Sequence, residues 1–447
     1  LLWLIALLPL VSAPNRQALK SKSALQHSLP FSASLLCMDR FRWGDLVELL
    51  ETIAVTLHSS SLRDYDTLRG FLQDEWASKE THFFTAVWPK LVRLALEMPQ
   101  LFPESFLLCL SEEHRELKLS RRQVGCLVIH QFLCSLPKQP WAIDSAQDFR
   151  IWYSSGSRYS LATRVYLSFQ RLSCVGDETQ PVLSPLMNEW PIIFTLRIFQ
   201  ENRVVQLDLS LLKHPLCQLT VVHLPTASTE PSLLGLLDGA CVISANKSVG
   251  FVQTGTQEEV QVRSSPESCL VVLLTPTLQD NQVLIVQGAE AVTIKGYGRE
   301  ARLDSVLTAD YVFSAGDSQM IKMVTTDHAL HGCSTIANCS KYAVLSVAAL
   351  QEERKSCYTE IVTRLWGCGS FGGNPQIKTL IQWCASSMAQ TNLQLVSSGE
   401  DQVVLARELN EIVKMTREGL WTVKDVLDTI GAQKPSDWPR VSRVDAV

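Results

Sequence analysis

The sequence predicts an α/β protein in which a helical part precedes a mixed β-sheet flanked by helices. Before about residue 190, apolar residues recur at helical spacing and no strand pattern is convincing. Beyond it, short β-rich runs are separated by Gly, Pro, Asp and Asn, and helices follow toward the C-terminus. Strands combined with crossover helices are typical of a layered α/β domain.

The length of the chain bounds its domain organisation. It has 447 residues, of which 46% are hydrophobic. Because a single core rarely grows beyond about 250–300 residues, we expect two domains or one large elaborated domain. The expected parts are a poorly defined apolar and Ser-rich segment at 1–40, a helical accessory domain with a connecting segment at 41–190, and the α/β domain at 191–447.

Three helices are expected in the helical part. Apolar residues at helical spacing predict one over 43–58. A second candidate covers 81–98, where Pro89 kinks the helix or marks a new start. Ser120, with Gln123 three residues later, matches a capping box, so a helix should begin there and continue through the apolar run that follows.

In the α/β domain, six short runs are candidate strands. They are 204–209, 219–224, 241–244, 260–263, 270–274 and 283–286. Two helices with a β-rich run between them are expected near the C-terminus. They cover 375–388 and 403–415, and the run between them is 393–396.

Charge and cysteine usage exclude several classes of function. The formal net charge is −5 and no strongly basic block occurs, which disfavours general binding to duplex nucleic acid. The 13 cysteines are odd in number and irregularly spaced, which argues for reduced thiols rather than a disulfide framework. No Cys or His pattern has zinc-ligand spacing, so we expect no metal site.

The N-terminal run allows two interpretations. Leu1–Val11 is almost wholly apolar and could be the core of a signal peptide. No Met or basic residue precedes it, so it could equally be an internal helix of a fragment. The run is too short to span a membrane, and we expect no membrane association.

Two adjacent carboxylates follow a loop between two expected strands, in the segment 245–259. Glycines and an Asn can bring backbone N–H groups close to a ligand. If the carboxylates begin a strand, their side chains point to opposite faces, so one of them can face a pocket. The alternative is a solvated acidic loop end. The distinctive residues are Asn246, Gly250, Gly255, Gln257, Glu258 and Glu259.

A second segment, 366–375, reads Trp-Gly-Cys-Gly-Ser-Phe-Gly-Gly-Asn-Pro. Asn374 suits a helix N-cap and Pro375 the first helical position. A glycine-rich loop that leads into a helix N-terminus favours an anion, although a tight turn explains it equally well. A third segment places Tyr297 between two glycines, where it could stack on a base or ribose, or simply mark a turn. A second Gln-Glu-Glu, at 351–353, lies in an expected surface helix and is read as a solvated face.

Taken in order, these segments resemble the poly(ADP-ribose) glycohydrolase family over roughly Phe41 to Ala432. The matching segments are Ala245-Asn246-Lys247, Gln257-Glu258-Glu259, Gly296-Tyr297-Gly298, Trp366-Gly367-Cys368-Gly369 and Phe371-Gly372-Gly373. The resemblance implies a macrodomain-like core behind a helical accessory domain. It also implies hydrolysis of the ribose–ribose O-glycosidic bonds of poly(ADP-ribose), a glycosidase activity that needs no metal or cofactor.

The resemblance assigns roles to individual residues. Glu259 would protonate the departing ribose oxygen and then activate water. Glu258 would bind ribose hydroxyls, and Asn246 would position the sugar. Tyr297 and Phe371 would contact the terminal ADP-ribose. The remaining expected substrate-binding residues are Gln257, Gly250, Gly255, Gly369 and Gly372.

The sequence departs from the family pattern before the two glutamates. The family has three consecutive glycines there, whereas this chain has Gly250 and then Phe251, in a segment about three residues short. The alternative function is therefore a weakened or inactive relative that binds ADP-ribose or acts as a scaffold. The expected partners are poly(ADP-ribose) or ADP-ribosylated proteins. We expect a monomer in the nucleus or cytoplasm that acts in the DNA damage response, with secretion as the alternative.

Overall fold

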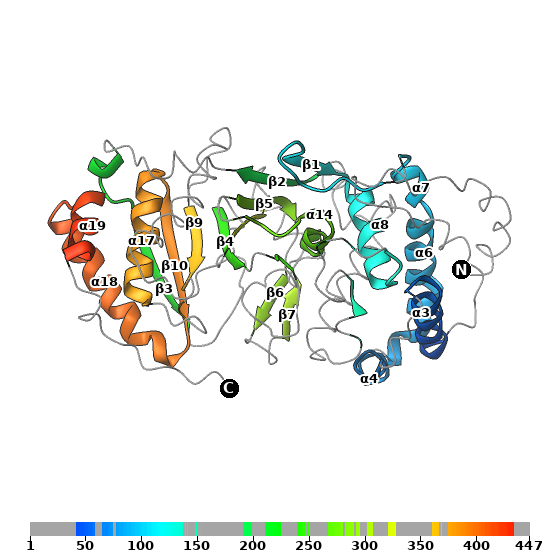
Figure 1. Ribbon diagram of the computed structural model, residues 1–447. Helices are drawn as coiled ribbons and strands as arrows, with labels where there is room; N and C mark the ends of the chain where they lie inside the picture. Colours follow the sequence, from blue (N-terminus) through cyan, green and yellow to red (C-terminus); the bar gives the residue numbers. More distant parts are fainter. Residues whose placement is uncertain are drawn as a thin grey trace. The chain divides into compact units, whose positions relative to one another are not determined.

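The computed structural model forms two compact units (Figure 1). The first comprises residues 1–194, 250–277 and 288–309, and the second comprises 195–249, 278–287 and 310–447. The structure describes residues 42–58, 65–74, 77–104, 106–136, 139, 141, 148–150, 153, 191–198, 211–224, 239–245, 248–250, 267–279, 282–289, 292–295, 302–306, 321–327, 360–365, 368 and 374–432.

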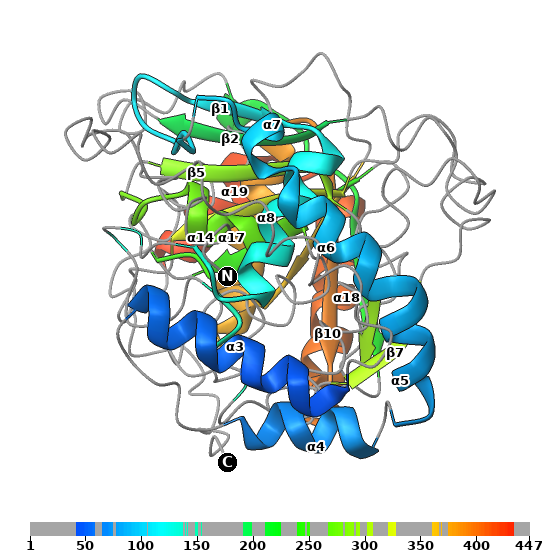
Figure 2. The same cartoon turned by 90° about the vertical axis from the view of Figure 1, so that its right-hand side faces the viewer.

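The first unit is rich in helices, as the sequence predicted. Figure 2 shows α3 packed beside α4. The helices are α3 (Trp43–His58), α4 (Asp66–Asp74), α5 (Glu80–His82), α6 (Trp88–Leu96), α7 (Met98–Leu101), α8 (Arg121–Phe132) and α14 (Val271–Leu274). The short helical turn η3 (Ala77–Lys79) precedes α5. A β-hairpin of the same unit pairs β6 (Val292–Lys295) with β7 (Arg302–Val306) in antiparallel fashion.

The second expected helix is interrupted where the proline predicted it. A π-helical segment, η4 (Phe83–Val87), ends directly before α6, and Pro89 occupies the first turn of α6. Proline is tolerated at a helix start, because the N–H it lacks would have no partner within the helix there. Pro89 therefore marks a new helical start.

The predicted capping box of α8 is confirmed. The Gln123 backbone N–H donates to Ser120 Oγ at 3.2 Å, and the Ser120 backbone N–H donates to Gln123 Oε1 at 2.9 Å. The two contacts satisfy amide donors that the first turn of a helix leaves without partners.

Aromatic side chains join α3 to the helical stretch around residue 85. The Trp43 ring lies 4.8 Å from the Phe83 ring and 4.9 Å from the Phe84 ring, between centroids. All three side chains are buried. Such pairs stabilise a core beyond the area that they bury.

Two expectations for the first unit were wrong. The strand β1 (Glu116–Leu119) was not predicted, because four residues with Glu and Lys give too little β-rich pattern. The run 270–274, expected as a strand, is helical in η7 (Glu267–Leu270) and α14. Its five apolar residues are buried on every side, so no periodicity distinguishes helix from strand.

The strands of the second unit lie in one sheet, in the order β2-β5-β8-β4-β9-β10-β3. The neighbours from β8 to β3 are parallel. The strands are β2 (Ile192–Ile198), β3 (Leu219–Leu224), β4 (Gly239–Ala245), β5 (Gln282–Ala289), β8 (Ile321–Asp327), β9 (Glu360–Arg364) and β10 (Asn392–Ser398).

The strand predicted over 219–224 is confirmed with its bounds, and those at 241–244, 283–286 and 393–396 are the centres of longer strands. The sequence pattern missed β2, β8 and β9. The expected strands at 204–209 and 260–263 lie outside the described residues.

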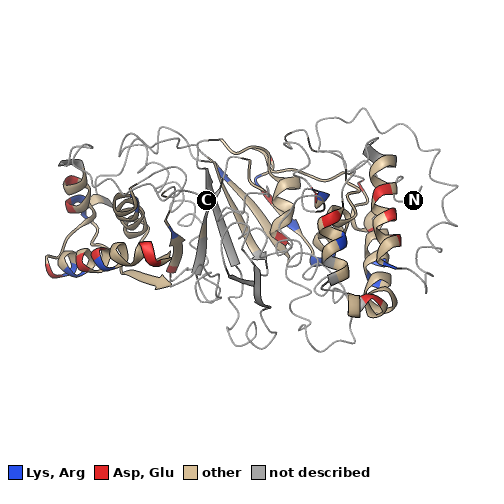
Figure 3. Cartoon of the chain, turned by 90° about the horizontal axis from the view of Figure 1, so that it is seen from below, with Lys and Arg blue, Asp and Glu red and all other residues tan. Residues whose placement is uncertain are grey.

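Three helices pack on one face of this sheet. They are α17 (Pro375–Met388), α18 (Val403–Glu418) and α19 (Val423–Ala432). Their apolar residues form one core with Leu219, Ile361 and Leu395 of the strands. Charges of both signs lie along the outer faces of α18 and α19 (Figure 3), including the ion pairs Lys414–Glu418 and Lys424–Asp428.

In the part of the chain that the structure describes, no helix has the length and apolarity needed to cross a membrane.

Candidate functional site

The candidate site lies where two neighbouring parallel strands end. β4 and β9 pair in parallel, with Gly239 beside Glu360 and Cys241 beside Val362. Because the strands are parallel, their carboxyl ends share one edge of the sheet. β4 leads directly into residue 246, and β9 leads through Leu365 toward α17. The two segments singled out in the sequence therefore leave from adjacent strands.

The outgoing connections of these two strands diverge. After β4, the next strand of this sheet along the chain is β5, on the β8 side, whereas β9 is followed by β10 on the other side. In open α/β sheets, ligands bind outside the carboxyl ends of the strands at such a switch in strand order. The order of the sheet thus favours a ligand site beyond β4 and β9.

The N-terminus of α17 faces this edge of the sheet and is built as predicted. Asn374 has extended backbone angles, φ −75° and ψ 118°, and its Oδ1 accepts a hydrogen bond from the Ile377 N–H at 3.0 Å. Pro375 follows at the start of the helix. The N–H groups and the dipole at such a terminus favour an anionic group.

The face of the sheet under α17 becomes polar toward the same edge. Leu393 and Leu395 of β10 are buried in the core, and Ser397, two residues further on the same face, is also buried. Its Oγ lies 3.2 Å from Nδ1 of His223, its partner in the register on β3. Polar side chains thus replace the apolar core near the strand ends.

Helix α17 also carries buried polar side chains. Gln382 Nε2 donates to Thr363 Oγ1 of β9 at 3.1 Å, and both residues are buried. Within the described structure, Gln382 Oε1 and Thr379 Oγ1 are buried without a hydrogen-bond partner. Buried polar atoms of this kind destabilise the fold unless water or a ligand satisfies them.

A lysine near the start of α17 and a cysteine that precedes this helix influence each other's pKa. Lys378 is 5% exposed. Burial lowers the pKa of its ammonium, and the neighbouring Cys368 opposes that shift. Burial also raises the pKa of the Cys368 thiol to about 12, with Lys378 acting in the opposite direction. Cys368 is therefore a protonated thiol at neutral pH and a poor nucleophile.

Most of the sequence-predicted site residues lie outside the described residues, so their placement stays a prediction. They are Asn246, Gly255, Gln257, Glu258, Glu259, Tyr297, Gly369, Phe371 and Gly372. Two of them adjoin described strands. Asn246 directly follows β4, and Tyr297 comes two residues after β6.

Gly250 is described, and its surroundings give a second reason for a glycine. It is buried, and a Cβ at this position would lie 2.7 Å from Cγ1 of Val272 in the same unit. Close packing against Val272 thus excludes a larger residue, independently of any ligand.

Lys378, Gln382 and Thr363 were not singled out from the sequence. For Lys378 and Gln382, part of the signal was present in the sequence. Lys378 and Gln382 are four residues apart, and therefore on one face, within a helix whose other positions predict burial. Thr363, which accepts the hydrogen bond from Gln382, could not be found, because the strand that carries it, β9, was not predicted.

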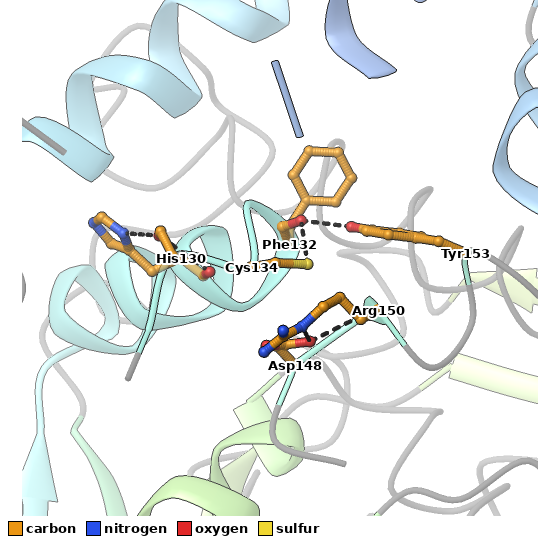
Figure 4. Close-up of polar contacts among 7 residues, drawn as sticks. His130, Phe132, Cys134, Asp148, Arg150 and Tyr153 are labelled. Carbon is orange, nitrogen blue, oxygen red and sulfur yellow. Dashed lines mark hydrogen bonds and ion pairs between the residues drawn. The ribbon is translucent and has the colours of Figure 1, made fainter. Parts of the chain in front are cut away.

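A separate buried polar cluster in the first unit has a structural character (Figure 4). Asp148 and Arg150 form a buried ion pair, with Oδ2 and Nη2 2.6 Å apart, and Tyr153 donates to the Phe132 carbonyl at 2.5 Å. His130 Nδ1 lies 2.6 Å from Ser135 Oγ. Burial lowers the pKa of His130 to about 4, so its ring is neutral at pH 7. These contacts lie inside the core of the first unit.

Curated relatives match parts of the chain. Poly(ADP-ribose) glycohydrolase 1 of Arabidopsis thaliana is 39% identical over 66 residues, which cover 15% of this chain and 12% of the relative. Poly(ADP-ribose) glycohydrolase 2 of Caenorhabditis elegans is 26% identical over 194 residues, which cover 39% of each protein. The chain thus spans about two fifths or less of the curated relatives it matches.

Solved structures show only remote similarity to this chain. Poly(ADP-ribose) glycohydrolase from Deinococcus radiodurans, in complex with ADP-ribose, is 16% identical with a TM-score of 0.32, over 49% of this chain and 95% of that one. A macrodomain mutant from Oceanobacillus iheyensis is 11% identical with a TM-score of 0.29, over 44% of this chain and 93% of that one.

Two family models give the assignment. The helical domain of poly(ADP-ribose) glycohydrolase matches residues 76–175, and its macro domain fold matches residues 213–404. The two matches occur in the order that the helical part and the sheet follow along the chain. The chain belongs to the poly(ADP-ribose) glycohydrolase family and combines the family's helical domain with its macro domain fold.

Proposed function

We propose that this chain hydrolyses the ribose–ribose O-glycosidic bonds of poly(ADP-ribose) and releases ADP-ribose. Membership of a glycosidase family supports the proposal. The observation that carries it is the adjacency of the carboxyl ends of β4 and β9, from which the segments containing Asn246 and Gly369 depart.

In the proposed reaction, Glu259 is the general acid and then the general base. Its carboxyl proton passes to the departing ribose oxygen as the bond between that oxygen and the anomeric carbon breaks, through an oxocarbenium-like transition state. The resulting carboxylate accepts a proton from water as the water oxygen bonds to the anomeric carbon. Glu258 binds ribose hydroxyls, Asn246 positions the sugar, and Gln257 contacts the substrate.

The family resemblance assigns the contacts to the rest of the ligand. Tyr297 and Phe371 contact the terminal ADP-ribose, and the segment of Gly369 and Gly372 lies by the diphosphate. The start of α17 supplies oriented N–H groups for its negative charge. Gly250 and Gly255 allow the backbone to approach the ligand.

The test is release of ADP-ribose from labelled polymer. We expect Glu259→Gln to lower the rate by about 10²–10⁴-fold, the usual contribution of general acid–base catalysis. Glu353→Gln is the matched control, because it changes the corresponding residue of the second Gln-Glu-Glu. Equal rates for wild type and Glu259→Gln would sink the proposal.

A second candidate is an inactive relative that binds ADP-ribose or acts as a scaffold. Phe251 favours it, since it follows Gly250 directly where the resemblance leads us to expect glycine. The packing of Gly250 against Val272 also explains that glycine without a ligand. Heat released on titration with ADP-ribose, without hydrolysis of polymer, would select this candidate.

The wider biology also stays a proposal. The substrate class implies encounters with ADP-ribosylated proteins, in the nucleus or cytoplasm and in the DNA damage response. A monomer suffices, because the proposed residues all come from one chain. Imaging of a tagged chain before and after DNA damage tests the location.

A further inference from the structure

Two short helical elements from the middle of the chain are buried in the first unit. They are η7 and α14, which run without a break from Glu267 to Leu274. Every residue after Glu267 in this pair is buried. The pair packs against α8, although 146 residues separate Arg121 of α8 from Glu267. Specific contacts must therefore fix where the pair lies on α8.

Both ends of α8 make such contacts. Nη1 of Arg121, the first residue of α8, lies 3.3 Å from Oε1 of Glu267. Near the other end of α8, Nε2 of Gln131 donates to the Cys269 carbonyl at 3.1 Å. The helical part thus holds η7 by a side chain and by a backbone carbonyl.

Of these contacts, the ion pair is the one that fold stability explains least. The side chains of Arg121 and Glu267 are only 10% and 13% exposed. Burial of two charges costs solvation free energy, and apolar residues of similar volume are often as stable or more stable. The start of α8 adds a second cost, because the positive end of a helix dipole disfavours a cation. What the pair provides is one defined position, since either charge would be buried without its partner in any other.

The segment before η7 begins on the same two elements. A Cβ at Gly250 would lie 2.7 Å from Cγ1 of Val272, so the backbone of Gly250 packs directly on α14. Along the sequence, Glu259 comes nine residues after Gly250 and eight residues before Glu267. Both ends of the segment that contains Glu259 are therefore fixed to η7 and α14, which α8 holds.

We propose that Arg121 is a positioning residue of the helical part that acts through Glu267. Arg121 keeps η7 and α14 in one position on α8, and these elements fix both ends of the segment that carries Glu259. A segment with two fixed ends has fewer conformations than a free one, which limits where its side chains can be. The role for Glu259 rests on the proposed function, whereas the hold on η7 and α14 does not.

Hydrogen exchange of the intact protein tests the hold on η7 and α14. Two amides report on α14: the Leu110 N–H donates to the Leu274 carbonyl at 2.7 Å, and the Thr275 N–H donates to the Val271 carbonyl at 2.9 Å. In Arg121→Met, both should exchange faster than in wild type, relative to the amides of α6, by roughly tenfold or more through local opening. General unfolding would accelerate the amides of α6 as well and leave this ratio unchanged.

A neighbouring residue supplies the matched control. Arg122 follows Arg121 in the first turn of α8 but pairs with Glu97. Arg122→Met should therefore leave the exchange ratio at its wild-type value. Glu267→Gln, a milder change, should raise the ratio as Arg121→Met does, and the exchanged pair Arg121→Glu with Glu267→Arg should bring it back toward wild type. An unchanged ratio in both Arg121→Met and Glu267→Gln, or an equal rise in Arg122→Met, overturns the proposal.

Polymer hydrolysis separates this inference from the proposed function. Rates are expressed per ADP-ribose site titrated by calorimetry, so that unfolded molecules do not count. Arg121→Met should lower kcat per site by roughly ten- to a hundredfold, the scale of a misplaced catalytic group, with little change in KM. Arg122→Met should keep the wild-type kcat. If wild type hydrolyses no polymer, the proposed function fails while the exchange result still stands. If Arg121→Met keeps the wild-type kcat per site, the link from Arg121 to Glu259 is wrong.

Discussion

The Gln382 amide donates a hydrogen bond to the Thr363 hydroxyl, 3.1 Å away, and this contact ties α17 to β9 inside the core. Thr363→Val should destabilise the protein by about 1–3 kcal/mol, because the buried amide loses its partner. The double variant Thr363→Val with Gln382→Leu should recover most of that loss. Urea denaturation of the two single variants and the double variant measures the coupling. Additive losses would show that the contact contributes nothing.

Variants of Gly250 test whether this glycine is needed for packing against Val272 or for the approach of a ligand. Gly250→Ala should destabilise the protein by about 1–3 kcal/mol, the usual cost of overpacking, because the new Cβ would meet Val272 at 2.7 Å. Adding Val272→Ala should relieve that overlap. Thermal melting of the single and double variants checks the stability. If stability returns while ADP-ribose binding stays lost, Gly250 also serves the ligand.

The buried His130 should make the folded protein less stable in acid. Its folded-state pKa is about 4, lowered first by burial, against an ordinary value of 6.5. The unfolded chain therefore takes up the proton first, so stability is full above pH 6.5 and falls as the pH drops from 6.5 to 4. The full shift corresponds to about 3 kcal/mol. Urea unfolding of wild type and His130→Gln at pH 7.5, 5.5 and 4 should show a smaller pH dependence in the variant.

The Asp148–Arg150 pair should be sensitive to loss of either partner. Asp148 is fully buried and Arg150 nearly so. Asp148→Asn should destabilise the protein by about 3–5 kcal/mol, since a guanidinium would stay buried without its counter-charge. The exposed pair Lys424–Asp428 is the control, and Asp428→Asn should leave the denaturation midpoint unchanged. Similar midpoints for both variants would contradict the role of burial.

Local signals predicted helices better than strands. Asn374 and Pro375 mark the start of α17 chemically, so both of its bounds were found from the sequence. β9 has five residues and pairs with strands far away along the chain, and nothing local announces those partners. For the same reason, the sequence pointed to the start of α17 as an anion site, but not to the contact of Gln382 with Thr363 beneath it. The family resemblance supplied the catalytic hypothesis, which neither composition nor periodicity contains.

The division of the chain into two interleaved units has a genetic consequence. Residues 250–277 and 288–309 belong to the first unit, although they lie between segments of the second unit along the chain. A stop codon near residue 195 would therefore remove the whole second unit and also two segments of the first. Because neither unit is one continuous segment, neither can be moved between genes as a single piece of sequence. We therefore expect the helical part and the sheet to be inherited together. Expression of 195–447 alone should yield insoluble or protease-sensitive protein, whereas co-expression of the two halves should rescue it.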